Sequence, residues 1–572
     1  MSMRVGTSTG SAAGLHRQVL AALALMLSPL ASLMAQATGA PAPGAPSRIS
    51  GNLTISNELY NASGIAARRP GSTWRVQAAP SLRLFGATSV GVEVLLSNEG
   101  ADFRQRLPQF GLEPRFGWGT LHLGDFSKDY GAYTLQGLRI RGAGVDLTRG
   151  PVRASVQAGV SQNAIQTTVN GPVFQRTVLA GTVGIGKPEE RSLDLTLVRA
   201  LDALRGSEQP FADTLGPDTL AADQRPQAFT RPQSGLVAAL AGTFGLFASK
   251  LRFKGELSGA LLTRDRTSPL LNTDSVPGGG IISGSGTDVR LSSAADLAWN
   301  AEAQYRGDNF GVRVGMEQVG AGYGSLGVAY LINDRQSRFA SGDVRLFRDR
   351  VQLQGRVQQQ EDNLIGQKRF TTSRDVYQAG AIFRIARGSV ALTGVRNLAL
   401  NDATNDTLLV DNTANVVNAQ VSYPIRFGKK DLGITLGGSW QQNEDANAVR
   451  AIPAITVRTW TAGLSVPVGP VTLSPSVNGV SSEGGGAAAQ RNVVGGFRAS
   501  ARLAQGKGSL SAGYNRTFVA AREVSGATAQ FTLAMPWETR LQLAGRHQRY
   551  GALGTRPAFR ESYLTTTLSR SF

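Results

Sequence analysis

The chain has 572 residues, no cysteine and a formal net charge of +19. The absence of thiol groups excludes disulfides and sites with cysteine-bound zinc or iron–sulfur clusters. The basic residues are mostly arginines spread singly along the chain. They form no dense cluster of the kind that binds nucleic acid, so we expect no nucleic-acid partner.

The first 37 residues have the pattern of a secretory signal peptide. Arg4 and Arg17 precede the apolar run Val19–Met34, and Ala35-Gln36-Ala37 is a cleavage motif, with a cut after Ala35 as the alternative. Residues 38–48 are rich in Ala, Pro and Gly and predict a flexible lead-in. The first strand is expected near residues 49–60, which leaves no room for a plug domain before it.

From there the chain repeats one unit: a strand, a tight turn, a strand and a longer connection. In Val351–Gln358 valine, leucine and glycine alternate with glutamine and arginine, and Leu251–Leu257 alternates in the same way. Period-two alternation predicts strands with one apolar and one polar face. Tight turns, marked by Gly, Pro, Asn, Asp or Lys, are predicted at 85–88, 114–119, 149–151, 186–191, 242–249, 306–309, 348–350, 386–389, 428–431, 468–470, 505–508 and 536–538.

These hairpins predict an all-β fold: one transmembrane antiparallel β-barrel over residues 49–572, with about 22–26 strands and 26 as the best estimate. A soluble sandwich rarely contains so many strands, and a β-helix would not alternate short and long connections. Long connections are expected at 98–112, 161–175, 202–232 and 263–294, and shorter ones at 321–337, 401–413 and 442–454.

The last twelve residues, Glu561–Phe572, alternate and end on an aromatic side chain. This segment resembles the closing strand of Gram-negative outer-membrane β-barrels. The resemblance implies an outer-membrane location, lipid and lipopolysaccharide as surroundings, and recognition by the barrel-assembly machinery during insertion. The assembly signal would comprise Tyr563, Leu564, Leu568 and Phe572. Arg570 departs from the pattern because it falls on the apolar face, where its long stem can reach the interface.

A second segment, residues 124–142, joins Gly124-Asp125-Phe126 to a run of glycine and aromatic residues and an arginine-flanked strand. It resembles segments of large translocation barrels such as fimbrial ushers and the type 9 secretion translocon. The resemblance implies a possible periplasmic or secretion partner, although the periplasmic domains of an usher are missing. A strand, a polar turn and a bulged strand would give the same pattern.

The sequence offers little for catalysis. After the leader it contains two histidines, His122 and His547, and neither lies in a motif with a nucleophile and an acid. Two histidines without cysteine predict no transition-metal site. The glycine runs precede no phosphate-binding lysine, so no cofactor is expected. We therefore expect a protein that is not an enzyme.

The predicted function is a passive pore or translocation channel with an arginine-rich, anion-preferring lumen. The alternative is a structural or secretion component closed by a partner, and an outer-membrane enzyme is the third possibility. Because so wide a barrel would leak, loops 202–232 and 263–294 or the stretch 98–137 are expected to fill the lumen and keep conductance low. The candidate lumen-lining residues are Arg139, Arg141, Arg153, Arg252, Lys254, Arg313, Arg345, Arg356, Arg540 and Arg546.

Overall fold

The computed structural model describes residues 47–84, 88–98, 109–164, 173–204, 231–272, 288–428, 430–447, 449, 453–485, 487–519 and 522–572. The predicted signal peptide and nearly all of the lead-in lie outside the described residues. The strands are β1 (Ser47–Ser63), β2 (Ser72–Leu84), β3 (Thr88–Ser97), β4 (Gln109–Phe116), β5 (Gly119–Ser127), β6 (Arg139–Arg149), β7 (Val152–Gln162), β8 (Arg176–Lys187), β9 (Arg191–Asp202), β10 (Ser234–Leu246), β11 (Leu251–Thr263), β12 (Ser293–Arg306), β13 (Phe310–Val319), β14 (Arg335–Leu346), β15 (Val351–Asp362), β16 (Thr372–Ile385), β17 (Gly388–Asn401), β18 (Asp411–Phe427), β19 (Lys430–Asp445), β20 (Ile455–Val468), β21 (Val471–Gly484), β22 (Ala487–Leu503), β23 (Gly508–Val519), β24 (Val524–Met535), β25 (Thr539–Tyr550) and β26 (Phe559–Ser571), with one 3-10 turn, η2 (Ala504–Gly506).

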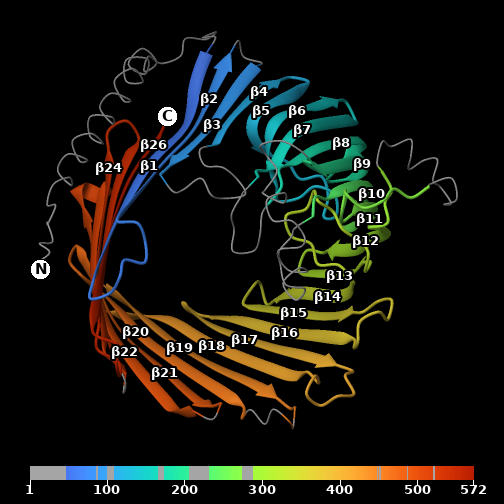
Figure 1. The fold of residues 1–572 in the computed structure, drawn as a ribbon. Helices are drawn as coiled ribbons and strands as arrows, with labels where there is room; N and C mark the ends of the chain where they lie inside the picture. Colours follow the sequence, from blue (N-terminus) through green and yellow to red (C-terminus); the bar gives the residue numbers. More distant parts are fainter. Residues whose placement is uncertain are drawn as a thin grey trace, which may run out of the picture.

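The strands form one closed antiparallel barrel (Figure 1). Each strand pairs with the next in sequence, and β26 pairs with β1, for example at Tyr60 and Tyr563. Closure leaves no unpaired strand edge, which a barrel in lipid requires. The predicted fold class and the best estimate of 26 strands are confirmed.

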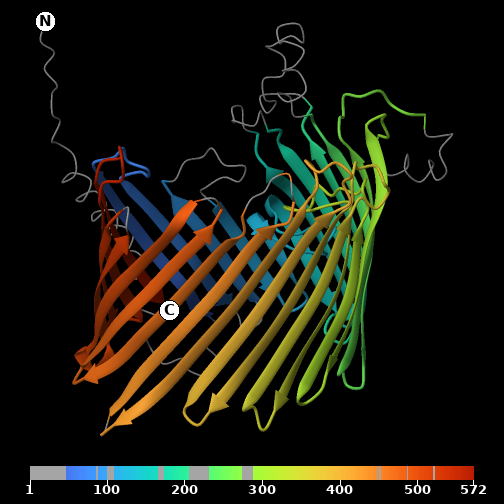
Figure 2. The ribbon, with the colours of Figure 1, turned by 90° about the horizontal axis from the view of Figure 1, so that it is seen from below.

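The two ends of the barrel differ (Figure 2). At one end lie the short connections of two to four residues, each of which follows an even-numbered strand from β2 to β24. Phe572 lies at the same end, beside the β24–β25 turn. We call it the tight-turn end, and the other the long-loop end. The predicted tight turns fall at this end, with three qualifications. β4 continues to Phe116, so the turn predicted from Pro114 begins later, at Gly117. The 85–87 turn lies outside the described residues, and β10 continues to Leu246, so the turn predicted from Gly242 begins later, at Phe247.

The exterior of the barrel is apolar. Residues paired across strands share a face, so the pattern can be followed around the barrel. Val183 on β8 and Leu195 on β9 form one outer-face pair and are 59% and 61% exposed. The neighbouring pair, Thr182 and Thr196, points inward, and the two hydroxyl groups lie 3.0 Å apart. Such a belt of exposed apolar side chains fits a lipid environment.

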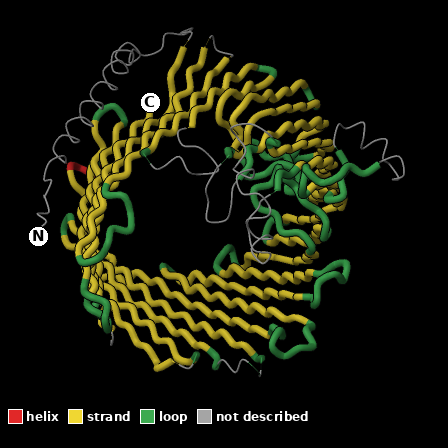
Figure 3. Tube along the Cα trace, viewed as in Figure 1, coloured by secondary structure: helices red, strands yellow, loops and turns green. Residues whose placement is uncertain are grey.

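The interior has two unlike halves. Along β14–β26 the inner positions are mostly polar, as at Gln352, Gln354 and Arg356 of β15. Along β5–β13 the described loops gather on the inner side of the wall (Figure 3). Within the described ranges, no helix is long and apolar enough to cross a membrane.

Candidate functional site: the lumen and its inner layer

Two connections from the long-loop end fold back inside the barrel and lie against its wall. Residues 128–138, between β5 and β6, form the first inner segment; residues 320–334, between β13 and β14, form the second. Side chains of both pack on the inner face of β5–β13. We call the two segments together the inner layer. Of the predicted fillers 202–232 and 263–294, residues 205–230 and 273–287 lie outside the described residues. The first inner segment overlaps the end of the predicted stretch 98–137.

The two inner segments are hydrogen-bonded to each other. Gln136 N donates to Gly327 O at 3.0 Å, and Ala329 N donates to Gln136 O at 3.0 Å. The Ser325 hydroxyl donates to Thr134 O at 2.9 Å. Gly327 approaches the first segment so closely that an added Cβ would overlap the Thr134 carbonyl oxygen. The segments are therefore one packed unit rather than two separate loops.

Under the inner layer the barrel wall is apolar. The inner-layer side chains that pack against this wall are buried: Leu135 is 0% exposed and Tyr323 is 1% exposed. Each apolar side chain removed from water contributes roughly 25 cal/mol per Å² of buried area, so this packing holds the layer in place. On β8–β13 the inner-facing wall residues in this cluster are valines and alanines: Val178, Ala180, Val198, Ala200, Val237, Ala260, Ala298 and Val319.

Polar anchors fix the position of the layer. The Glu256 carboxylate of β11 accepts the backbone N–H groups of Ala132 at 2.9 Å and Tyr133 at 3.3 Å. The Tyr323 hydroxyl donates to Tyr133 O at 2.9 Å and lies 2.7 Å from the Ser258 hydroxyl. Burial raises the pKa of Tyr133 to about 12 and also raises the pKa of Tyr323. Both phenols therefore remain protonated donors at physiological pH.

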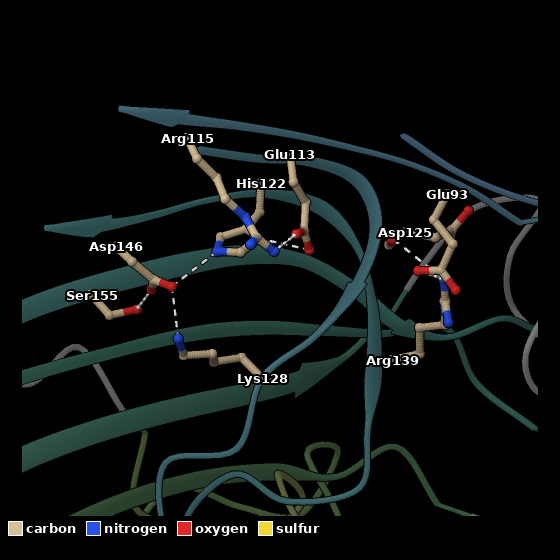
Figure 4. A network of polar contacts seen from close by, with 9 residues as sticks. All are labelled: Glu93, Glu113, Arg115, His122, Asp125, Lys128, Arg139, Asp146 and Ser155. Carbon is tan, nitrogen blue, oxygen red and sulfur yellow. Dashed lines mark hydrogen bonds and ion pairs between the residues drawn. The ribbon is translucent and has the colours of Figure 1, made fainter. Parts of the chain in front are cut away.

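A charged network ties the start of the first inner segment to β4–β7 (Figure 4). The His122 ring lies between two carboxylates, with Nδ1 3.3 Å from Glu113 Oε1 and Nε2 3.0 Å from Asp146 Oδ2. Asp146 also accepts hydrogen bonds from Lys128 Nζ at 2.6 Å and from the Ser155 hydroxyl at 2.5 Å. Because Lys128 begins the inner segment, the network is a second anchor for the layer.

This network lacks the geometry of a hydrolytic triad. In a triad the imidazole contacts the nucleophile, but here Asp146 stands between His122 and Ser155. The other histidine, His547, contacts the Ser562 hydroxyl at 2.8 Å on the outer face. In the described part of the chain, no three His, Asp or Glu side chains are grouped so that they could hold a metal ion. The arrangement supports anchoring rather than catalysis.

Strand pairing assigns a face to each candidate lumen residue. Arg139 and Arg141 fall on the opposite face from Ile140, which is 0% exposed in the core beneath the inner layer. Arg139 Nη2 lies 3.1 Å from the Glu93 carboxylate of β3, and Arg141 Nη2 lies 2.8 Å from the Asp125 carboxylate of β5. For these two residues a place in the lumen lining stays a prediction. On the inner face lie Arg153, Arg252, Lys254, Arg313, Arg345, Arg356, Arg540 and Arg546.

These basic side chains are spread around the wall, but two of them contact the same aromatic ring. The guanidinium groups of Arg313 and Arg356 lie over the Phe339 ring, 5.3 and 5.8 Å from its centroid. They line a recess of about 300 Å³ on β12–β16. Arg313 is paired with Glu302 at 2.5 Å, whereas Arg356 Nη2 donates to the neutral amide of Gln358 at 2.8 Å. Arg356 thus keeps a full positive charge toward the lumen.

The predicted assembly residues lie at the seam where the barrel closes. On β26, Leu564 and Leu568 share the outer face, while Tyr563 faces inward and its ring lies 5.1 Å from that of Tyr60. Phe572 exchanges two backbone hydrogen bonds with Gly51, at 2.8 and 3.0 Å. The chain end is therefore held in the closing pair of strands.

No family model and no curated protein matches the sequence. Solved structures with a similar fold include the P pilus usher (PapC) translocation pore, at 9% identity and a TM-score of 0.39, covering 92% of this chain and 99% of that one. The outer-membrane protein OpdK from Pseudomonas aeruginosa gives 12% identity and a TM-score of 0.31, covering 60% and 94%. The ferric enterobactin receptor (PfeA) of the same species gives 10% identity and a TM-score of 0.41, covering 93% and 81%. At these TM-scores the likeness identifies no substrate or partner.

The second inner segment was not predicted: residues 321–337 were expected to be one of the shorter connections between strands. One local sequence signal was present: Gly320-Ala321-Gly322-Tyr323 is similar in sequence to Gly131-Ala132-Tyr133 of the first segment. Leu326 and Leu331 also follow without alternation, and both pack on the core of the inner layer. Glycines beside buried aromatic and aliphatic residues indicate a backbone that approaches another surface closely.

Proposed function

We propose that the protein is a non-enzymatic pore or translocation barrel of the bacterial outer membrane. The observation that carries this proposal is the closed 26-strand barrel with an apolar exterior and a mostly polar inner face on β14–β26, which the inner layer does not cover. An apolar exterior fits lipid, and a polar interior fits water and hydrophilic solutes. Arrival in that membrane would follow cleavage of the predicted leader and recognition of Tyr563, Leu564, Leu568 and Phe572 by the assembly machinery.

We propose further that the pore prefers anions. The candidate lumen cations on the inner face include Arg356, which donates a hydrogen bond to the neutral amide of Gln358. Several others are balanced by acids, as Arg153 is by Asp194 at 2.6 Å. Unbalanced positive charge concentrates anions and selects by sign. The recess at Arg313 and Arg356 is then the strongest contact point for a passing anion.

The inner layer narrows this pore from one side. It occupies the lumen along β5–β13 and is held by buried side chains and hydrogen bonds rather than by a single hinge contact. We therefore expect a low conductance for the intact protein. A secretion component closed by a partner is the second candidate, because a barrel of 26 strands is wider than the 16–18 strands, roughly, of solute porins.

The reversal potential in a salt gradient across a planar bilayer tests the anion preference. The intact protein should be anion-selective, and Arg356→Gln should lower the anion-to-cation permeability ratio by about two-fold or more. The control is Arg560→Gln, which removes the same charge from the outer face of β26. Cation selectivity of the intact protein, or equal shifts in both variants, would contradict the proposed lumen.

A further inference from the structure

The tight-turn end carries a set of exposed aromatic side chains distributed around the barrel. Phe247 is 73% exposed, and Phe347, Phe427 and Trp537 are each 75% exposed; Trp118 is 57% exposed. They lie at the connections β4–β5, β10–β11, β14–β15, β18–β19 and β24–β25. At these exposures the rings contribute little to barrel packing. Amphipathic and aromatic side chains prefer the headgroup level of a bilayer.

Three of these turns hold their aromatic residue in a left-handed backbone conformation; Trp537 has a φ of 60°. Phe247 and Phe347 have φ values of 52° and 55°, and the two residues after each also have positive φ. The turns are closed by Lys250 N donating to Phe247 O at 3.2 Å and by Arg350 N donating to Phe347 O at 3.4 Å. A left-handed conformation costs a non-glycine residue about 1 kcal/mol. Packing within the barrel does not compensate for it, because the rings are exposed.

The same end is strongly basic. Arg149, Arg348, Arg350, Lys430 and Lys507 are exposed at its turns, and within the described ranges none of them has an ion-pair partner. Acidic residues also lie at these turns, among them Asp349 between Arg348 and Arg350, but basic residues outnumber them, so the end carries a net positive charge. These cations belong to four different hairpins, from β6–β7 to β22–β23.

The long-loop end has basic residues too, but many of them are neutralised. Lys368 Nζ lies 2.7 Å from Asp334 and 2.9 Å from Asp362, and Arg176 lies 2.7 Å from Asp202. Ion pairs also occur at the tight-turn end, at Lys187–Glu190 and Lys250–Asp308, so the free positive charge of that end is carried by the five cations named above.

We propose that the tight-turn end binds the headgroups of anionic phospholipids in the surrounding leaflet. Unpaired cations interleaved with exposed aromatic rings attract anionic lipid, each cation near the surface contributing about 1 kcal/mol. The features surround the barrel, as lipid does, whereas a protein partner would contact one sector. This inference rests on the membrane placement in the proposed function but does not depend on conduction.

The test uses the full barrel reconstituted in phosphatidylcholine bilayers that contain spin-labelled phosphatidylglycerol or spin-labelled phosphatidylcholine. Electron paramagnetic resonance gives the association of each lipid with the protein boundary. We expect phosphatidylglycerol to associate about two-fold or more above phosphatidylcholine, and this preference to fall at high salt because exposed charges are screened. The variant R149Q/R348Q/K507Q should lose most of the preference.

The matched control, R369Q/R556Q/R560Q, removes three exposed charges at the long-loop end and should retain the preference. Heat-modifiable migration on a gel confirms that each variant is folded. No preference for phosphatidylglycerol in the intact protein, or equal losses in both variants, would overturn the proposal. The proposal would also be overturned, in favour of a protein partner, if the protein showed no lipid preference but bound a soluble acidic polypeptide through the cations of the tight-turn end.

Discussion

The two halves of the barrel interior follow different rules. On β15 the inner face carries Gln354 and Arg356 opposite apolar outer residues, so a strand there has one wet face. On β9 the inner Val198 is 1% exposed while its outer neighbours Leu195 and Leu197 are 61% and 53% exposed. A strand that is apolar on both faces must be covered on both. The difference identifies which part of the wall needs the inner layer.

The largest expected effect comes from placing a charge in the core beneath the inner layer. Leu135→Asp loses the buried side chain and adds a carboxylate without a partner, which should destabilise the layer by about 3–5 kcal/mol. We expect hydrogen exchange and protease cleavage in residues 128–138 and 320–334 to rise together. The control Thr528→Asp adds the same charge to the uncovered inner face of β24 and should leave both segments protected. Release of one segment without the other would contradict a single packed unit.

A smaller effect is expected where the two segments approach each other. Gly327→Ala adds a Cβ that overlaps Thr134 O, at a cost of about 1–3 kcal/mol for an over-packed site. Gly394→Ala, where nothing lies within 4 Å of the added atom, is the matched substitution in the other half. Hydrogen exchange at Gln136 and Ala329 measures the difference. Equal exchange in both variants would show that the contact between the segments is loose.

Glu256→Gln should weaken the polar anchor by about 1–3 kcal/mol, because the two backbone N–H groups donate to different carboxylate oxygens and the amide offers only one, neutral, acceptor oxygen. Exchange of the Ala132 and Tyr133 amides should increase several-fold. Glu302→Gln changes the same chemistry at the Arg313 pair, away from the inner layer, and should leave those amides unchanged. An equal effect of the two substitutions would remove Glu256 from its anchoring role.

The smallest effect concerns pH at the end of the second inner segment. Burial opposes ionisation of Asp334, but hydrogen bonds from Lys368 at 2.7 Å and from Leu364 N at 2.8 Å leave its pKa lowered. Because the pKa of Asp334 is lowered in the folded state, ionised Asp334 stabilises the end of the second inner segment at every pH above its ordinary pKa of about 4. This stabilisation is lost as pH falls through the lowered pKa. Exchange near residue 334 should therefore rise only in acid, and Asp334→Asn should abolish that dependence. A transition between pH 5 and 8 would implicate another group.

The barrel could be predicted from sequence because its pattern is local. Alternation in Val351–Gln358 and turn residues at 348–350 are enough to define a hairpin, and repetition of such hairpins defines the closed sheet. The inner layer depends on distant contacts: Tyr323 bonds to Tyr133, 190 positions away, and neither segment alternates. Arg139 illustrates a related limit, because its guanidinium pairs with Glu93 of β3 at 3.1 Å, a contact that no local pattern indicates.

An inner layer on one half of the wall should narrow an anion-preferring pore. The most direct measurement is the single-channel conductance of the intact protein and of Leu135→Asp, recorded in planar bilayers under identical salt. The account predicts a small, anion-selective conductance for the intact protein and a clearly larger one for the variant. A large, cation-selective conductance of the intact protein, or no change on substitution, would contradict it.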